Sequence, residues 1–265
     1  MRKTALTLTV STLVLGIFGA FLRWLQTMNA FDKETGFPIP GAGTTVVFVI
    51  YSIVAVAAFC VVSLFWLGRF DRGTDADRAL HCDSIFPFII GWVLYAAFAA
   101  ASCVLLFAAG HSRYPVGQRL FGAFGILAGI SIPFLFTKKN GGGFGSVGRS
   151  AAVVITLFYC FWLVFCYKLN SEDPILWNYA LEILAVTAAT AAFYFIAAYF
   201  FGAGRGGRAL VAVQLGIYLN VATLFDERST ALNILLGVTA AMLLMLEYLL
   251  IANMSETYRE DEKKQ

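Results

Sequence analysis

The feature that most constrains the fold of this chain is a series of long apolar blocks separated by short polar segments. A helix of about 20 residues matches a hydrocarbon core of roughly 30 Å. Lipid offers no partner to backbone N–H and C=O groups, so such blocks must form helices or barrel strands. Barrel strands alternate apolar and polar residues, and these blocks do not. We therefore predict an all-α integral membrane protein, a bundle of about eight transmembrane helices.

Composition supports this fold class. The 265 residues are 60% hydrophobic and 13% charged, with a mean hydropathy of +0.77, whereas soluble domains contain about 25% charged residues. A soluble core of this size could not bury so much apolar surface. The net charge of +3 is modest and no large basic domain is present, so no nucleic-acid partner is expected and the lipid bilayer is the expected partner.

The spans are predicted to make up one transmembrane domain over residues 1–265. They are placed at 4–25, 44–68, 85–109, 116–137, 150–169, 175–201, 208–226 and 229–253. The segment 138–149 divides them into four and four, and the two halves show no convincing repeat. The first block could also be a cleaved signal peptide. An uncleaved helix is favoured, because the block is long for that purpose and lacks a convincing cleavage site.

Lysine and arginine predict the orientation, because they concentrate in cytoplasmic loops. With the N-terminus in the cytoplasm, 13 of the 19 basic residues lie inside. These are Arg2, Lys3, Arg69, Arg72, Arg78, Lys138, Lys139, Arg149, Arg205, Arg208, Arg259, Lys263 and Lys264. The outside carries Arg23, Lys33, Arg113, Arg119, Lys168 and Arg228. Both termini are therefore predicted to be cytoplasmic, which agrees with an even number of spans.

Glycines recur at helical spacing in two spans. The stripes comprise Gly16, Gly19 and Arg23 in span 4–25, and Gln118, Gly122, Gly125 and Gly129 in span 116–137. Small residues let helix backbones approach closely in lipid. Both spans are therefore predicted in the bundle interior, and packing of the two stripes against each other is one arrangement that this allows.

Polar side chains gather in the predicted outer half of the membrane. Intramembrane charges are costly and usually face a partner in the bundle interior. Glu182 is the main candidate, with Arg23 and Arg119 as the cations at similar depth. One hypothesis is an outward-facing pocket in which the arginines hold an anionic group and Glu182 binds a cation or a proton. The other is a structural ion pair with arginines reaching the interface. The candidate ligand-binding residues are Arg23, Arg119, Glu182, Asn178, Tyr218, Asn220 and Gln118.

Two further sets of charges are predicted to be hydrated. Asp226, Glu227 and Arg228 are expected in a tight outer turn, and Glu247 is expected as an interfacial charge near the inner end of the last span. The inner segments 138–145 and 202–208 are basic and glycine-rich. They are either a site for a phosphate or a protein partner, or hydrated linkers near anionic headgroups.

Catalytic and cofactor motifs are absent from the sequence. It has no His-Glu-x-x-His, no Gly-x-Ser-x-Gly and no intramembrane lysine for a Schiff base. His81, Cys82 and Asp83 are adjacent but have no second cluster at ligand spacing. We therefore predict no cofactor, no metal site and no enzyme activity. An intramembrane enzyme remains the least favoured alternative.

One stretch carries a resemblance to a known group of proteins. It runs from Arg23-Trp24-Leu25-Gln26 through Ala30-Phe31-Asp32 and Glu34-Thr35-Gly36-Phe37-Pro38-Ile39-Pro40-Gly41. It resembles a segment of uncharacterised multispanning membrane proteins of clostridial gut bacteria. The resemblance implies a multi-pass protein of the bacterial cytoplasmic (inner) membrane, and it implies no activity.

The glycine stripes and the outer polar set together favour a transporter of a small molecule or ion, or a substrate-binding membrane subunit. The alternative is a non-catalytic sensor or a partner subunit of a larger complex. Its support is the lack of a complete charged pathway and the presence of two basic inner loops.

Overall fold

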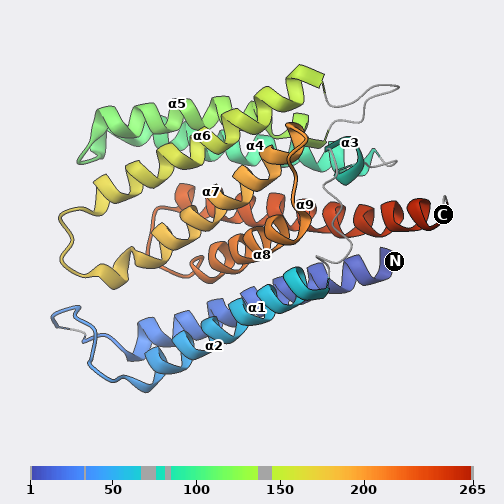
Figure 1. Cartoon of the computed structure of the whole chain (residues 1–265). Helices are drawn as coiled ribbons and strands as arrows, with labels where there is room; N and C mark the ends of the chain where they lie inside the picture. The colour runs from blue at the N-terminus through green and yellow to red at the C-terminus, as the bar shows by residue number, and fades with distance from the viewer. Residues whose placement is uncertain (1, 33, 67–75, 81–84, 137–144, 264–265) are drawn as a thin grey trace.

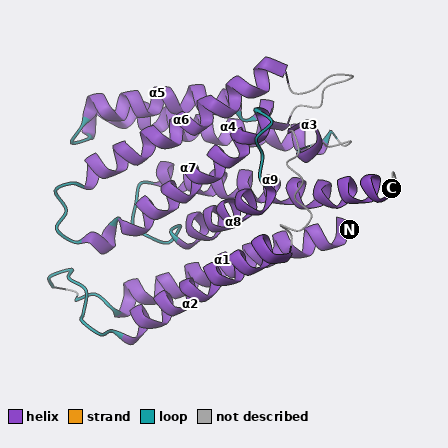
Figure 2. Cartoon of the chain, viewed as in Figure 1, coloured by secondary structure: helices purple, strands orange, loops and turns teal. Residues whose placement is uncertain are grey.

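The computed structural model describes residues 2–32, 34–66, 76–80, 85–136 and 145–263. Long helices run side by side along one bundle, and short loops join them (Figure 2). The helices are α1 (Arg2–Asn29), α2 (Gly43–Cys60), α3 (Ala76–Ala79), α4 (Phe86–Phe107), α5 (Pro115–Ser131), α6 (Gly145–Asn170), α7 (Ala180–Phe200), α8 (Gly206–Ala222) and α9 (Thr230–Lys263). Both ends of the chain lie at the same end of the bundle (Figure 1). We call this the terminus end and the opposite one the distal end.

Seven helices within the described residues are long and apolar enough to cross a membrane. They correspond to all the long helices except α8. Large apolar side chains point outward from them, such as Ile53 at 63%, Phe65 at 69% and Phe107 at 83% exposure. In α2 only 17% of the apolar span is buried. Soluble monomers rarely expose such extensive apolar surface, so these faces are suited to lipid.

Helix α8 is the central element of the bundle. It has 17 residues, which at 1.5 Å per residue makes it about 26 Å long. All but three of its residues, Arg208, Val211 and Leu215, are buried. It packs against α7, α9, α1 and α2. The α1–α2 hairpin lies along one side of this centre, and α4, α5 and α6 lie on the other (Figure 1).

Most predicted spans coincide with helices of the structure, but the start of the sixth span differs. Residues 175–201 were predicted as one continuous span. In the structure Leu176–Asn178 forms a short 3-10 helix and α7 begins only at Ala180. The Asp173 carboxylate accepts a hydrogen bond from the Ile175 amide at 2.8 Å. It therefore caps a turn before α7 and does not cap α7 itself.

The two glycine stripes lie in helix contacts, but not with each other. A Cβ at Gly19 would lie 2.7 Å from Cε2 of Tyr218 on α8, and one at Gly16 would lie 3.2 Å from Cβ of Val221. In α5, Gly122 and Gly125 instead pack against α4, close to Leu106 and Ser102. The suggestion that spans one and four pack through their stripes is therefore wrong. Each stripe fits a different neighbour.

Candidate functional site: two buried polar networks

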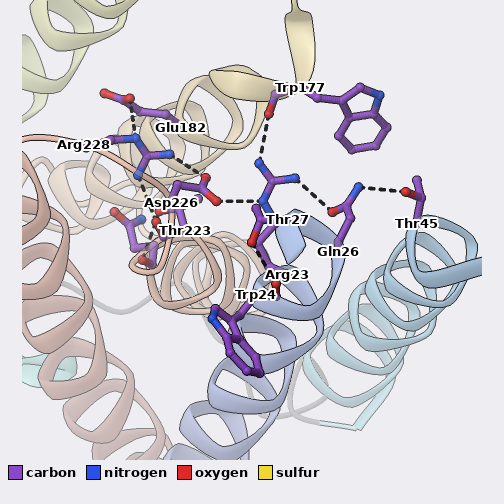
Figure 3. Close-up of polar contacts among 11 residues, drawn as sticks. Arg23, Trp24, Gln26, Thr27, Thr45, Trp177, Glu182, Thr223, Asp226 and Arg228 are labelled. Carbon is purple, nitrogen blue, oxygen red and sulfur yellow. Dashed lines mark hydrogen bonds and ion pairs between the residues drawn. The ribbon is translucent and has the colours of Figure 1, made fainter. Parts of the chain in front are cut away.

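At the distal end, Arg23 of α1 is held by protein groups on every nitrogen of its guanidinium. Nε donates to Oδ1 of Asp226 at 2.7 Å, Nη1 to Oε1 of Gln26 at 2.9 Å, and Nη2 to the Trp177 carbonyl at 2.9 Å (Figure 3). Gln26 in turn donates to the Thr45 hydroxyl on α2 at 3.2 Å. Arg23 thus joins α1 and α2 to the α6–α7 loop and the α8–α9 turn.

A second arginine extends this network to α7. Nη2 of Arg228 donates to Oδ2 of Asp226 at 2.8 Å, and Nη1 donates to the Thr223 carbonyl at 3.0 Å. Nε of Arg228 lies 2.8 Å from Oε2 of Glu182, although its N–H is not aligned for a hydrogen bond. The charges therefore alternate along Arg23, Asp226, Arg228 and Glu182. We call these four residues the distal cluster.

The distal cluster is buried and electrically balanced. Its four side chains are 2–7% exposed, and two cations face two anions. Glu182 lies in the first turn of α7, where the helix dipole favours a negative charge. Desolvation of ion pairs is costly even when they are well matched, and removing one partner typically costs about 3–5 kcal/mol. The cluster therefore holds the distal end together and is closed to solvent in this structure.

The sequence-predicted site residues fall into separate places. Arg23 and Glu182 both belong to the distal cluster, but each pairs with a residue of the α8–α9 turn. Arg119 is exposed on α5, so Glu182 does not take it as a partner. Asn178 is exposed and donates to Asp173 at 3.0 Å. Gln118 is half-buried and donates to the Leu105 carbonyl at 2.9 Å.

Asp226 and Arg228 were missed as site residues. The turn between α8 and α9 was correctly predicted, but its charges were expected in water. In the structure Asp226 and Arg228 point inward and only Glu227 is exposed. The sequence did hold a clue to these two residues. Arg23 and Glu182 each need an opposite charge at their depth, and the predicted turn lies at the same end of the bundle.

Tyr218 and Asn220 lie deeper, on α8, and both are fully buried. The Tyr218 hydroxyl is 2.7 Å from the Ser52 hydroxyl of α2. Asn220 donates to the carbonyls of Gly216 at 2.7 Å and Ala185 at 3.3 Å. Tyr218 therefore links α8 to the α1–α2 hairpin, whereas Asn220 links it to α7.

A second network lies in the terminus half of the bundle. Oε1 of Glu247 on α9 accepts a hydrogen bond from Nε2 of Gln214 at 2.8 Å and lies 2.8 Å from Oγ1 of Thr12. Oε1 of Gln214 accepts from the Ser63 hydroxyl at 2.7 Å. Ser63 belongs to a π-helical turn, Val61–Trp66, that continues α2. We call Thr12, Ser63, Gln214 and Glu247 the inner network.

Glu247 is 0% exposed, so the prediction of a hydrated interfacial charge is wrong. Helix α9 continues beyond Asn253 to Lys263, so the end of the apolar span is not the end of the helix. Glu247 lies on the face that packs against α1 and α8. Within the described residues no cation forms an ion pair with it, and its Oε2 atom has no hydrogen-bond partner.

No group of three His, Cys, Asp or Glu side chains within the described residues is placed to hold a metal ion. The triplet His81, Cys82 and Asp83 lies outside those residues. Comparisons with protein-family models, with curated proteins and with solved structures find no match. The class of the protein therefore follows from its architecture, which is that of a multi-pass helical membrane protein with buried charge.

Proposed function

We propose that this chain is a membrane transporter for an ion or small solute. The observation that supports the proposal is the line of polar contacts between the α1–α2 hairpin and the helices behind it. Along α1, Thr12, Gly16, Gly19 and Arg23 lie at i, i+4, i+7 and i+11, on one helical face. This face meets Glu247, then Val221 and Tyr218, then Asp226.

Buried polar and ionisable contacts of this kind are unusual in a helix interface that serves packing alone. Apolar side chains would join two helices in lipid without the desolvation cost of buried charge, and intramembrane charges commonly mark substrate or ion pathways. Here ionisable side chains occupy both ends of one interface, Glu247 at one and Arg23 with Asp226 at the other, with the Tyr218–Ser52 hydroxyl pair between them. The arrangement supports a pathway between the hairpin and α8.

In this proposal the distal cluster is a closed gate. Every nitrogen of Arg23 is occupied by protein groups, so an anionic solute would bind there only after those contacts separate. Gly16 and Gly19 have no side-chain carbon, so at these positions α1 lies close against α8 with no bulky group of its own between the two helices. The hairpin moves along this face. The predicted ligand-binding role of Arg23 and Glu182 then belongs to the open state.

The proposal includes the predicted topology of eight crossings with cytoplasmic termini in a bacterial cytoplasmic membrane. Helix α8 supplies the eighth crossing, because it traverses the bundle between α7 and α9. Its ends are shielded by neighbouring helices, so a length below the hydrocarbon thickness is tolerated. The distal cluster then faces the outside, in agreement with the distribution of lysine and arginine.

Transport can be tested with purified protein in proteoliposomes on a solid-supported membrane. The probes are amino acids, carboxylates, sugars and monovalent cations, each added as a concentration jump. We expect one of these classes of solute to produce a transient current. The current should be at least tenfold smaller in Arg23→Gln. The matched control is Arg113→Gln, which breaks the exposed distal pair of Arg113 and Glu172 and should keep the current. A current that Arg23→Gln leaves unchanged would overturn the proposed role of the distal cluster as a gate.

A second function, that of a partner subunit, is favoured by one surface feature. An apolar groove of about 350 Å³ lies between α6 and α7. Its lining residues are Val153, Thr156, Leu157, Tyr194, Ala197, Ala198, Phe201 and Ala203. If no probe gives a current and a membrane protein co-purifies in fixed proportion, with loss of that partner in Leu157→Ser, the partner function replaces transport.

A further inference from the structure

The inner network contains a buried acid whose surroundings suit a neutral carboxyl better than a carboxylate. Glu247 is 0% exposed and lies six residues before Asn253, the last residue of the apolar span, which is about 9 Å of helix. An isolated buried carboxylate costs far more than a neutral acid. With no ion pair and no partner for Oε2 among the described residues, the charged form is poorly compensated.

The contacts of Thr12 give a second, independent indication. Its hydroxyl carries one proton, yet Oγ1 lies 3.1 Å from the Leu8 carbonyl and 2.8 Å from Oε1 of Glu247. A carbonyl oxygen cannot donate. Both contacts are therefore full hydrogen bonds only when the carboxyl supplies a proton to Thr12. In that case Oε2 is a neutral carbonyl oxygen, and leaving it without a partner is far less costly.

Among the side chains that the structure describes, the neighbouring helices place no other charge in contact with Glu247. The elements that pack against α9 are α1, α3, α4 and α8. Their titratable or charged side chains within the described part of the chain are Lys3, Arg23, Asp77, Tyr95, Cys103, Arg208 and Tyr218. None of these side chains forms a hydrogen bond or ion pair with Glu247, and within the described residues its carboxyl contacts Thr12 and Gln214.

We propose that Glu247 is a proton-binding site inside the bundle. Its proton leaves when the α1–α2 hairpin moves away from α8 and α9, because Thr12 and Ser63, both on that hairpin, are then withdrawn from the inner network and water enters. Proton release and solute movement are thereby coupled. The coupling rests on the transport function proposed above, whereas proton binding does not.

Proton binding is tested by infrared difference spectroscopy of the reconstituted full-length protein over a range of pH. We expect a C=O band of a protonated carboxyl in the wild type and in Glu34→Gln, which alters an exposed loop residue. The band should be missing in Glu247→Gln, a variant of the same shape. A band that persists in Glu247→Gln would overturn the proposal. So would a band that sodium ions abolish at constant pH, because the site would then bind a metal cation.

A second variant keeps the test decisive if Glu247→Gln does not fold. Thr12→Val removes the hydroxyl contact but retains the acid, and we expect the band to shift in frequency. An unshifted band would place the proton on another group. The matched control is Thr7→Val, one and a half turns away on α1, where the hydroxyl is exposed and bonds only to its own helix.

Coupling is tested separately with a pH-sensitive dye inside the proteoliposomes while each solute of the panel is added. We expect solute-driven proton movement that Glu247→Gln abolishes, with solute exchange retained. Solute uptake that ignores the pH gradient would overturn coupling. A carboxyl band without uptake of any solute would overturn the transport function and leave the proton site in place.

Discussion

Oδ1 of Asp226 accepts a hydrogen bond from Nε of Arg23 at 2.7 Å, although 203 positions separate the two residues in the chain. The contact joins the first long helix to the turn before the last one. Because Oδ2 of the same carboxylate accepts from Arg228, Asp226 stands between two guanidinium groups. The stability of the distal end should therefore depend strongly on this single carboxylate.

Asp226→Asn should destabilise the protein by about 3–5 kcal/mol, since it leaves two buried cations facing one anion. The measurement is reversible unfolding in mixed micelles. The control is Glu227→Gln, which changes the exposed neighbour and should alter stability by less than about 0.5 kcal/mol. Equal effects of the two substitutions would show that Asp226 is solvated in the membrane.

Glu182 and Arg228 should show energetic coupling in a double-mutant cycle. Each single substitution, Glu182→Gln or Arg228→Gln, leaves an unpaired charge in the buried cluster. The double variant removes both and should be less destabilised than the sum of the singles, with a coupling energy of about 0.5–3 kcal/mol. The same cycle on the exposed pair of Arg113 and Glu172 should give no more than about 1 kcal/mol. Additive effects at Glu182 and Arg228 would argue against their ion pair.

The long helices could be predicted because their signal is local. A block of apolar residues specifies a membrane helix without reference to its neighbours, and the predicted spans match seven helices of the structure to within a few residues. Arg23 and Glu182 were found by the same logic, since a charge inside an apolar block is conspicuous. The sequence grouped them by depth, but it did not reveal the partners Asp226 and Arg228 that join them, because helix packing decides which charges meet.

The errors have a common physical origin. Residues near the ends of apolar blocks were assigned to water from their position along the chain, but tertiary packing decides their exposure. Asp226 and Arg228 are buried because their turn folds back over α8, and Glu247 is buried because α9 continues well past the apolar span. Arg119 shows the converse, since a charge inside a predicted span is exposed on α5.

Gly19→Ala should destabilise the contact of α1 with α8, because the new Cβ would lie 2.7 Å from Cε2 of Tyr218. Overpacking of this kind costs about 1–3 kcal/mol. The control is Gly237→Ala on α9, where no heavy atom lies within 4 Å of the added Cβ, so helix propensity should stabilise by up to about 1 kcal/mol. Both are measured by unfolding in mixed micelles.

The same contact predicts a rescue. Combining Gly19→Ala with Tyr218→Leu removes the ring that the new methyl group meets, so part of the lost stability should return. Tyr218→Leu alone also removes the hydroxyl pair with Ser52 and should be destabilising. If the destabilisation of the double variant equals the sum of the two single destabilisations, the Tyr218 ring is not what prevents a larger residue at position 19.

In the α1–α2 loop, hydrogen bonds should lower the pKa of Asp32. The Thr35 hydroxyl donates to Oδ2 at 2.7 Å and the Glu34 amide donates to Oδ1 at 3.2 Å, which holds the pKa of this exposed carboxyl below its ordinary value. Because the pKa of Asp32 is lower in the folded protein, these hydrogen bonds stabilise the turn fully at pH values above the ordinary pKa of an aspartate. This stabilisation is lost as the pH falls through the lowered pKa of Asp32.

Thr35→Val removes the strongest of these donors, so the pKa of Asp32 should rise toward its ordinary value. The measurement is a carbon-13 NMR titration of the aspartate carboxyl groups in nanodiscs. Thr27→Val is the control, because that hydroxyl donates to the Trp24 carbonyl within α1 (Figure 3) and should leave the Asp32 titration unchanged. A titration that Thr35→Val does not move would mean that the Asx-type turn of Asp32 does not form in the membrane-bound protein.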